Sequence, residues 1–304
     1  MTMDPHMVQK LRHDFSVLIN ALASEQKFTE ARACAAIAVQ TGIWNNTDQR
    51  PAEYLPHLRA LPVHDTRDFP FVSALEAAFP KIRAELDPFL EDRDAIFRQV
   101  SRIKYLQGKW LRVVLYEHGQ WFAEGTRAFP ETSAVIRPIS EADCGGSTCL
   151  SWLEPATHLH PHCGKTNARL RLHMGLKVPS NTFLRVADQT LTWEEGKCFI
   201  FDDSFEHEVW NKSAETRVVL IMDIWHPDLT VAEKTTHLHK PLLSQEQMLL
   251  RRLRQTGLIS VRRQSNGSLS LAPNRDFANE LHHVLDQLGI HNASLGPQGA
   301  LQVS

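Results

Sequence analysis

RVVLIMDIW at residues 217–225 is the last of a series of apolar runs that begins at residue 110 and decides the fold. The earlier runs are WLRVVLY (110–116), SAVIRPI (133–139), CLSWL (149–153), ARLRLHMGLKV (168–178), TFLRV (182–186), LTW (191–193), KCFIF (197–201) and HEVW (207–210). They are rich in β-branched and aromatic residues, repeat with a period of two and are separated by turn signals, as strands are. Because no helical pattern interrupts them, the sequence predicts an antiparallel jelly roll, that is, a double-stranded β-helix.

Helical patterns precede this stretch. Apolar residues recur at helical spacing over residues 5–43 and again over about 70–100. The connector between them, at 49–62, is punctuated by prolines and is not expected to form a regular element. The fold class is therefore mainly β with flanking helices.

Helical patterns also follow the stretch, at about 244–256 and 274–288. Between them, LISVRRQSNGSLSLA (258–272) predicts a hairpin about Asn266-Gly267. We expect three parts: a helical N-terminal region at 1–100 packing on the core, a jelly-roll core at 101–230, and a helical C-terminal extension at 231–304 that acts as a lid or a dimer contact.

The composition favours an enzyme of the cytoplasm. Net charge is −2 with neutral histidines, so no overall field favours nucleic acid or an anionic membrane as a partner. The sequence has no run of about 18 apolar residues, and Asp4 and Asp14 argue against a secretory signal at the N-terminus. The five cysteines are odd in number and lack CxxC spacing, which fits a reducing compartment.

Histidines gather in two segments, THLHPHCGKTN at 157–167 and FDDSFEHEVWN at 201–211. Two histidines from well-separated strands can meet at the mouth of a jelly-roll barrel, and we take His162 and His207 as the metal-binding pair. Neutral imidazole suits Fe(II), and such a barrel leaves coordination positions free for an oxoacid and dioxygen. The run from His207 to Asn211 is similar to the later histidine motif of cupins, so the core is expected to be cupin-like.

The usual third ligand of such an iron site is a carboxylate two residues after the first histidine, and Gly164 stands there instead. Without that carboxylate the ferrous site keeps more positive charge and an extra open position, which water or another anion must fill. We do not expect Asp202 or Asp203 to be ligands. With Glu206 and His226, they are assigned to turn caps and strand ends.

Two simpler interpretations of the histidines remain open. His158 and His160 fit a surface strand with alternating polar residues. A zinc hydrolase would also use such a cluster, but Pro161 stands where the binuclear zinc pattern has an aspartate, which makes zinc the second choice.

Arg217 opens the long apolar run at 217–225, ten residues after His207. Burying an arginine there is costly unless it meets an anion, and its planar fork binds a carboxylate in a bidentate manner. We therefore assign the distal carboxylate of 2-oxoglutarate to Arg217; the alternative is a solvated arginine at a strand end. Arg169, Arg171 and His173 alternate on one strand and share a face.

Three longer runs carry a family resemblance. HPHCGKTNARLRLHMGL (160–176), TWEEGKCFIFDDSFEHEVWN (192–211) and IMDIWHPDL (221–229) resemble the corresponding runs of the aspartyl/asparaginyl β-hydroxylase family. The similarity extends over about residues 44–229 and leaves out residues 230–304. Members of this family lack the iron-binding carboxylate and hold iron with two histidines. The resemblance thus implies Fe(II), 2-oxoglutarate and O2 as the reacting partners.

The resemblance also implies roles for seven residues. His162 and His207 would ligate iron, and Arg217 would pair with the distal carboxylate of 2-oxoglutarate. The metal-proximal end of the cosubstrate would be supported by Arg171 and His173. Two further positions match a pocket tryptophan and a serine that touches the cosubstrate, and they are Trp110 and Ser151.

The predicted function is that of an Fe(II)/2-oxoglutarate-dependent dioxygenase that hydroxylates an unactivated C–H bond while 2-oxoglutarate is decarboxylated to succinate. We expect a small metabolite, an amino-acid-derived molecule or a carrier-bound intermediate as substrate. The basic stretch at 251–254 either docks an acidic carrier or is the solvated face of a helix. Alternatives are β-hydroxylation of Asp or Asn residues in a polypeptide, a halogenase with the same two-histidine site, and a non-catalytic cupin-like metal sensor.

Overall fold

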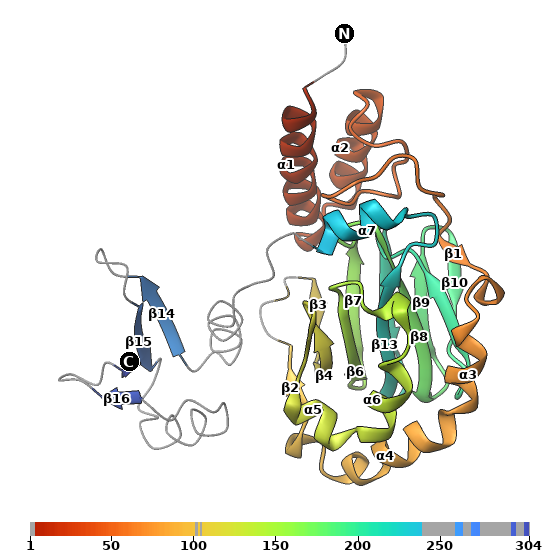
Figure 1. Ribbon diagram of the computed structural model, residues 1–304. Helices are drawn as coiled ribbons and strands as arrows, with labels where there is room; N and C mark the ends of the chain where they lie inside the picture. Colours follow the sequence, from red (N-terminus) through yellow and green to blue (C-terminus); the bar gives the residue numbers. More distant parts are fainter. Residues whose placement is uncertain are drawn as a thin grey trace. The chain divides into compact units, whose positions relative to one another are not determined.

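The computed structural model describes residues 4–100, 103, 105–238, 259–263, 269–273, 293–295 and 301–303. It divides the chain into two compact units, Met1–Lys240 and Pro241–Ser304. Figure 1 traces both units, and the sheets that position the site belong to the first. No helix among the described residues is both long and apolar enough to cross a membrane.

The larger sheet of the first unit is antiparallel and places its longest strands at its centre (Figure 1). Its order is β1 (Val63–His64), β11 (Cys198–Phe201), β8 (Arg169–Lys177), β13 (Arg217–Trp225), β6 (Ser147–Leu153), β4 (Trp110–Glu117) and β2 (Arg98–Gln99), with β5 (Gln120–Trp121) beside β4. Every residue of β13 is buried, because the strand has neighbours on both edges and both faces are covered. This explains its uninterrupted apolar sequence.

A smaller antiparallel sheet faces it. Its order is β10 (Gln189–Leu191), β9 (Thr182–Val186), β12 (His207–Asn211), β7 (Thr157–His162) and β3 (Leu106–Gln107). Leu159, Leu184 and Val209 from this sheet share one core cluster with Val219 and Phe201 of the larger sheet. Two antiparallel sheets closed over a common core are the jelly roll that the alternating sequence predicts, so the predicted fold class is confirmed.

Helices cover the other face of the larger sheet. They are α3 (Phe71–Ala77), α4 (Phe79–Glu91), α5 (Ala123–Ala128) and α6 (Pro130–Ile136). The predicted strand at 133–139 is wrong, because α6 occupies its first half. Phe129 and Ile136 are both fully buried and lie seven residues apart, which is two helical turns, and Pro130 takes the first helical position.

The N-terminal segment forms two helices, α1 (Pro5–Ser24) and α2 (Phe28–Gln40), as the apolar spacing predicts. The proline-punctuated connector that follows makes isolated bridges. Gln49 pairs with Phe205, and Glu53 pairs with Thr166. The connector therefore lies against the two segments that carry the histidine clusters, and not at a distance from them.

The second unit contains strands where a helical extension is expected. Its described residues form an antiparallel sheet in the order β14 (Ile259–Arg263), β15 (Leu269–Pro273), β17 (Leu301–Val303) and β16 (Ala293–Leu295). The two strands of the predicted hairpin are β14 and β15, which pair antiparallel, whereas the turn at Asn266-Gly267 lies outside the described residues. The helices expected at 244–256 and 274–288, and the basic stretch at 251–254, lie outside the described residues. A role as lid or dimer contact stays a prediction.

Candidate active site

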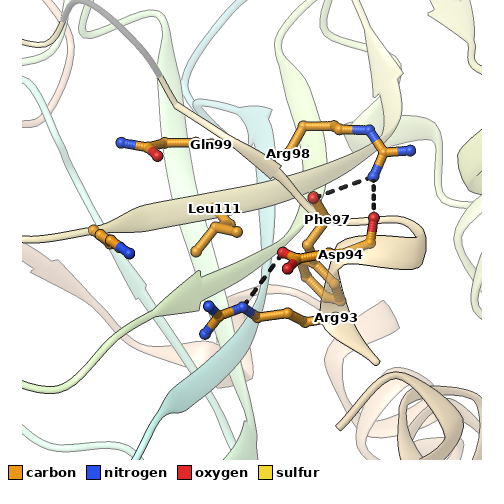
Figure 2. Close-up of a pocket in the computed structure, with 7 residues that line it drawn as sticks. Arg93, Asp94, Phe97, Arg98, Gln99 and Leu111 are labelled. Carbon is orange, nitrogen blue, oxygen red and sulfur yellow. Dashed lines mark hydrogen bonds and ion pairs between the residues drawn. The ribbon is translucent and has the colours of Figure 1, made fainter. Parts of the chain in front are cut away.

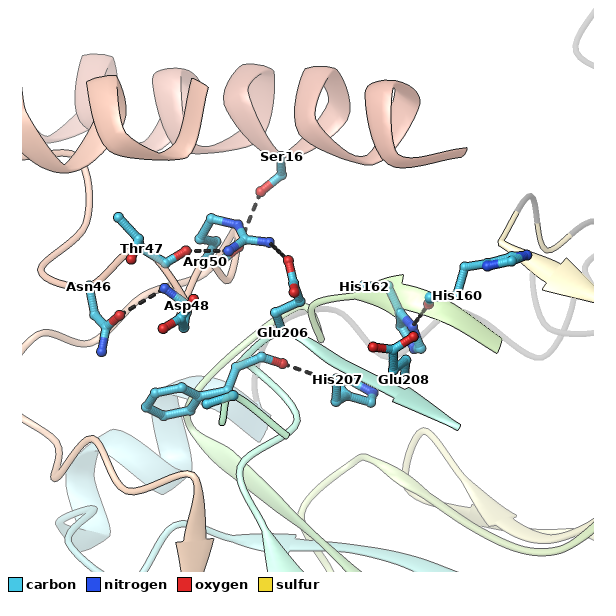
Figure 3. A network of polar contacts seen from close by, with 12 residues as sticks. Ser16, Asn46, Thr47, Asp48, Arg50, His160, His162, Glu206, His207 and Glu208 are labelled. Carbon is cyan, nitrogen blue, oxygen red and sulfur yellow. Dashed lines mark hydrogen bonds and ion pairs between the residues drawn. The ribbon is translucent and has the colours of Figure 1, made fainter. Parts of the chain in front are cut away.

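His162 and His207 lie opposite each other on neighbouring strands. They are register partners between β7 and β12, and their ring centroids are 4.2 Å apart at an interplanar angle of 51°. His162 Nδ1 lies 2.8 Å from the carbonyl oxygen of His160, and His207 Nδ1 lies 2.9 Å from that of Phe205 (Figure 3). In each ring Nδ1–H thus donates to the backbone, which leaves the Nε2 lone pair for a metal.

Burial keeps both rings neutral. Desolvation lowers the pKa of His162 well below its ordinary value, and the nearby His207 lowers it further. Desolvation lowers the pKa of His207 to about 4. The ring of Tyr105 stacks on His162 with centroids 4.0 Å apart at 17°. Neutral, fixed imidazoles are the form in which histidine binds a metal.

Asp203 occupies the space beside Gly164. The Gly164 N–H donates to the Asp203 carbonyl at 2.6 Å, and a Cβ at position 164 would overlap Asp203 Oδ1. The Asp203 carboxylate is ion-paired with Arg171 at 3.0 Å, and Arg171 Nε donates to Asp223 at 2.9 Å. No carboxylate side chain fits at 164, and the described residues contain no group of three His, Cys, Asp or Glu that would hold a metal. Among the described residues, the donors that this arrangement offers to a metal are the two histidines.

Asp202 points elsewhere. It is fully buried and accepts hydrogen bonds from the Ser204 N–H at 2.9 Å and from Gln49 Nε2 at 2.9 Å. Burial raises its pKa to about 7. Its predicted role in a turn fits these contacts.

Arg217 is a buried cation without a carboxylate partner among the described residues. The side chain is 2% exposed, its Nε and Nη1 have no hydrogen-bond partner, and Nη2 lies 3.4 Å from Ser151 Oγ. The guanidinium lies over the Trp193 ring at 4.5 Å from the centroid. Desolvation lowers its pKa to about 9. A buried guanidinium with two open donors is a binding site for an anion.

The other predicted cosubstrate residues surround Arg217. Ser151 Oγ accepts a hydrogen bond from Trp110 Nε1 at 2.9 Å, so its own proton is free to donate to an anion. His173 accepts from Trp193 Nε1 at 3.3 Å, while its buried Nε2 has no partner. Ser151 is on β6 and His173 on β8, the strands on either side of β13, and their register partners there are Val219 and Ile221. Adjacent strands of one sheet therefore bring these residues together.

The comparison with known families decides the classification. The family model described as aspartyl/asparaginyl beta-hydroxylase matches residues 76–227. The chain belongs to the aspartyl/asparaginyl β-hydroxylase family. This agrees with the motifs at 160–176, 192–211 and 221–229, all of which lie wholly or almost wholly inside the match.

Curated relatives of this β-hydroxylase family member are hydroxylases by name. Mouse aspartyl/asparaginyl beta-hydroxylase is 37% identical over 166 residues, which are 54% of this chain and 22% of the relative. Ornithine lipid ester-linked acyl 2-hydroxylase of Rhizobium tropici is 38% identical over 175 residues, which are 55% of this chain and 61% of the relative. The chain thus spans about a fifth of the length of the mouse relative and less than two thirds of the bacterial one.

A solved prolyl-4-hydroxylase of Pseudomonas putida aligns at 12% identity over 51% of this chain and 98% of that chain. Its TM-score is 0.34, so neither fold nor chemistry is inferred from it.

The side chains present fit the iron and the dicarboxylate that the β-hydroxylase resemblance implies. The two free Nε2 lone pairs are nitrogen donors of the kind that Fe(II) binds. The open donors of Arg217 and the unpartnered His173 Nε2 lie on the same inner face of the larger sheet, where a dicarboxylate would satisfy them. Arg171 was expected to support the metal-proximal end of the cosubstrate. In the structure, both of its ion pairs are to the protein's own carboxylates.

Three residues that contact the predicted ones were not identified from the sequence. Trp193 and Tyr105 contact predicted residues through their rings, and Asp223 shares Arg171 with Asp203. Arg169 was placed on the face of Arg171 and His173 from the sequence, but without a role of its own. Its alternation with Arg171 and His173 was the available signal for its inward direction. Aromatic residues that pack across strands leave no such local signal.

Figure 2 shows a separate hollow of about 430 Å³ beside β2, whose lining includes Arg93 and Arg98. Arg93 is ion-paired with Glu154, and Arg98 with Glu124 at 3.2 Å. Both cations already have carboxylate partners, and none of the residues that line the hollow belongs to the candidate site.

Proposed function

We propose that this protein is an Fe(II)/2-oxoglutarate-dependent dioxygenase that hydroxylates an unactivated C–H bond. The observation that carries the proposal is the buried, carboxylate-free Arg217 on the sheet that faces the His162–His207 pair. When bound, Fe(II), 2-oxoglutarate and O2 together supply the oxidising chemistry, and 2-oxoglutarate leaves as succinate and CO2.

The chain's own residues bind, orient and shield. His162 and His207 would hold the metal through Nε2, since Nδ1 of each is tied to the backbone. Arg217 and Ser151 would hold the distal carboxylate of 2-oxoglutarate, and the unpartnered His173 Nε2 lies on the same face of the sheet. Buried apolar residues of both sheets exclude water around these groups. No side-chain general base is required.

For the substrate, we propose a small, amino-acid-derived or carrier-bound molecule with an anionic group near the reacting carbon. Arg169 supports this, because it is half-buried on the inner face with Arg171, where its positive charge also acts on Asp203 and Asp223. An acyl chain is the second candidate, favoured by the name of the Rhizobium tropici relative. β-Hydroxylation of Asp or Asn residues is the third, favoured by the mouse relative.

Anaerobic addition of Fe(II) and 2-oxoglutarate to the purified protein tests the proposal. We expect a weak visible charge-transfer band that is absent from His162→Ala and His207→Ala, and that requires higher 2-oxoglutarate concentrations in Arg217→Met. Exposure to oxygen should then yield succinate. A folded wild-type protein without the band would refute the assignment. Turnover without oxygen would favour a zinc hydrolase, and a chlorinated product formed only with chloride would favour a halogenase.

A further inference from the structure

We propose that Arg50, from the connector after the N-terminal helices, is a positioning residue that fixes the metal ligand His207 through Glu206. This inference rests on the proposed function, since it concerns the affinity of the same two-histidine site for its metal. Arg50 Nη2 lies 2.8 Å from Glu206 Oε2, although the two residues are 156 positions apart in the chain. Figure 3 shows Arg50 between α1 and the strand that carries His207.

Glu206, the residue directly before His207, is held at every polar group. Its N–H donates to the Asp48 carbonyl at 2.6 Å, and its own carbonyl accepts from the Ala187 N–H at 2.9 Å. The carboxylate bridges two cations, with Oε2 on Arg50 and Oε1 at 3.0 Å from Arg185 Nη2. No polar atom of this residue is left to move independently.

Glu208, on the other side of His207, continues the same network. Its Oε1 lies 2.5 Å from Arg185 Nε, and its Oε2 lies 3.0 Å from Nε2 of His158. His158 is on β7, the strand of His162, so the ion pairs run from one ligand strand to the other. His158 is thus part of this network and is not a freely solvated strand residue as the sequence suggested.

The ion pairs that Glu206 and Glu208 make on either side of His207 are called the clamp below. The clamp lies where the backbone ladder is irregular. The pairing of β12 with β7 shifts register between His207 and Val209, which is a β-bulge or similar irregularity. Bulges interrupt ladder hydrogen bonds and re-aim side chains beside active sites. At such a position the direction of the His207 ring depends on side-chain contacts more than in a regular ladder. The two glutamates that flank His207 hold the backbone on either side of it through their ion pairs with Arg50, Arg185 and His158.

Arg50 is itself tightly held, so it transmits the position of the connector. Its side chain is 8% exposed, and Nη1 donates to the Thr47 carbonyl. Its N–H donates to the Ser204 carbonyl at 3.1 Å, and its carbonyl accepts from Ser16 Oγ of α1 at 3.4 Å. Ion pairs with this little exposure are strongly unfavourable to break, because one charge is left buried and unpaired.

The chain offers a matched control in Arg59. It belongs to the same connector and is ion-paired with Asp228 at 2.8 Å, but the two side chains are 50% and 30% exposed and neither touches a ligand strand. Arg59→Met therefore removes a connector-to-core ion pair without touching the clamp. A general loosening of the connector would weaken metal binding equally in both variants.

The test is an anaerobic titration of the metal-free, full-length protein with Mn(II), read by electron paramagnetic resonance, together with a thermal unfolding curve for each variant. We expect Arg50→Met and Glu206→Gln each to raise the Mn(II) dissociation constant about 10- to 100-fold, as loss of outer contacts to metal ligands typically does. The double variant should bind no more weakly than Glu206→Gln alone, because Arg50 acts through Glu206. Arg50→Lys should recover part of the loss, and Arg59→Met should bind as wild type does.

Each outcome decides one point. Mn(II) affinities of Arg50→Met and Glu206→Gln within twofold of wild type would overturn the inference, as would an equal loss in Arg59→Met. If Arg50→Met does not fold, the comparison of Glu206→Gln with Arg59→Met decides. If wild type binds no Mn(II), or His207→Ala binds it as well as wild type, then the proposed function fails, and not merely the clamp.

Discussion

Replacing Arg217 by methionine should stabilise the unliganded protein while removing its response to 2-oxoglutarate. The guanidinium is buried, and among the described residues it faces no carboxylate. Methionine keeps most of the packing on Trp193 but removes the buried charge. A residue kept for binding, at the expense of stability, is expected to behave in this way.

The size of the effect follows from the pKa of Arg217, which falls from the ordinary 12.5 to about 9 because of desolvation. At about 1.4 kcal/mol for a change of one in pKa, the buried charge costs the folded state up to about 5 kcal/mol. Stacking on Trp193 offsets about 2 kcal/mol of this. We therefore expect Arg217→Met to raise the unfolding free energy by about 2–3 kcal/mol. Because the pKa of Arg217 is lower in the folded state than in the unfolded state, folding disfavours the charged form. The difference in unfolding free energy between Arg217→Met and wild type is therefore complete below pH 9 and fades above it.

The assay is unfolding by denaturant at pH 7, with Mn(II) present and with or without 2-oxoglutarate. At a hundredfold excess over its dissociation constant, 2-oxoglutarate should stabilise wild type by about 2.7 kcal/mol and leave Arg217→Met unchanged. Arg171→Met is the matched control, because its loss strands Asp203 and Asp223 and should destabilise by about 3–5 kcal/mol. An Arg217→Met protein that is less stable than wild type and still stabilised by 2-oxoglutarate would refute the reasoning.

Three further predictions concern neighbouring residues. Gly164→Asp should not create a third metal ligand, because the new side chain would overlap Asp203. Thermal unfolding should show an unfolding free energy lower by about 1–3 kcal/mol, and metal titration should show weaker binding. The pKa of Asp202 is about 7 in the folded state and 3.8 ordinarily, so between pH 5 and 8 only the folded state still releases this proton. The unfolding free energy of wild type should therefore fall by about 2–3 kcal/mol relative to that of Asp202→Asn as the pH rises from 5 to 8. A difference between the two proteins that does not change with pH would contradict this. Tyr105→Phe should keep the Mn(II) affinity of wild type, whereas Tyr105→Ala should bind Mn(II) several-fold more weakly, since stacking on His162 needs the ring and not the hydroxyl. Equal losses of affinity in both variants would assign the effect to the hydroxyl.

The strands of the core were readable from the sequence because their signal is local. Alternation in CLSWL and TFLRV and the continuous apolar run of β13 each correspond to an observed strand. The run at 133–139 was misread because a two-turn helix and a short strand have similar composition, and burial of Phe129 and Ile136 against the sheet selects the helix. Whether a short apolar run forms a helix or a strand is decided by the elements that pack against it.

Part of the site was also readable. The spacing of His162 and Gly164, and the position of Arg217 at the start of β13, follow from residue type and periodicity, and the structure places these residues on facing strands. The contacts of Arg171 were not readable, because its partners, Asp203 and Asp223, lie 32 and 52 positions further on and reach it only when β11 and β13 pair with β8.

The sequence by itself determined where the long strands of the core run, which histidines are candidate ligands and which position lacks a carboxylate, because these follow from local periodicity and side-chain type. Only the tertiary structure decided which charges are paired. Among the described residues it left Arg217 without a carboxylate, gave Arg171 two, filled the space beside Gly164 with Asp203, and set Arg50 against Glu206 from 156 positions away. Desolvation and ion pairing depend on neighbours in space, and those neighbours exist only once distant segments have packed together.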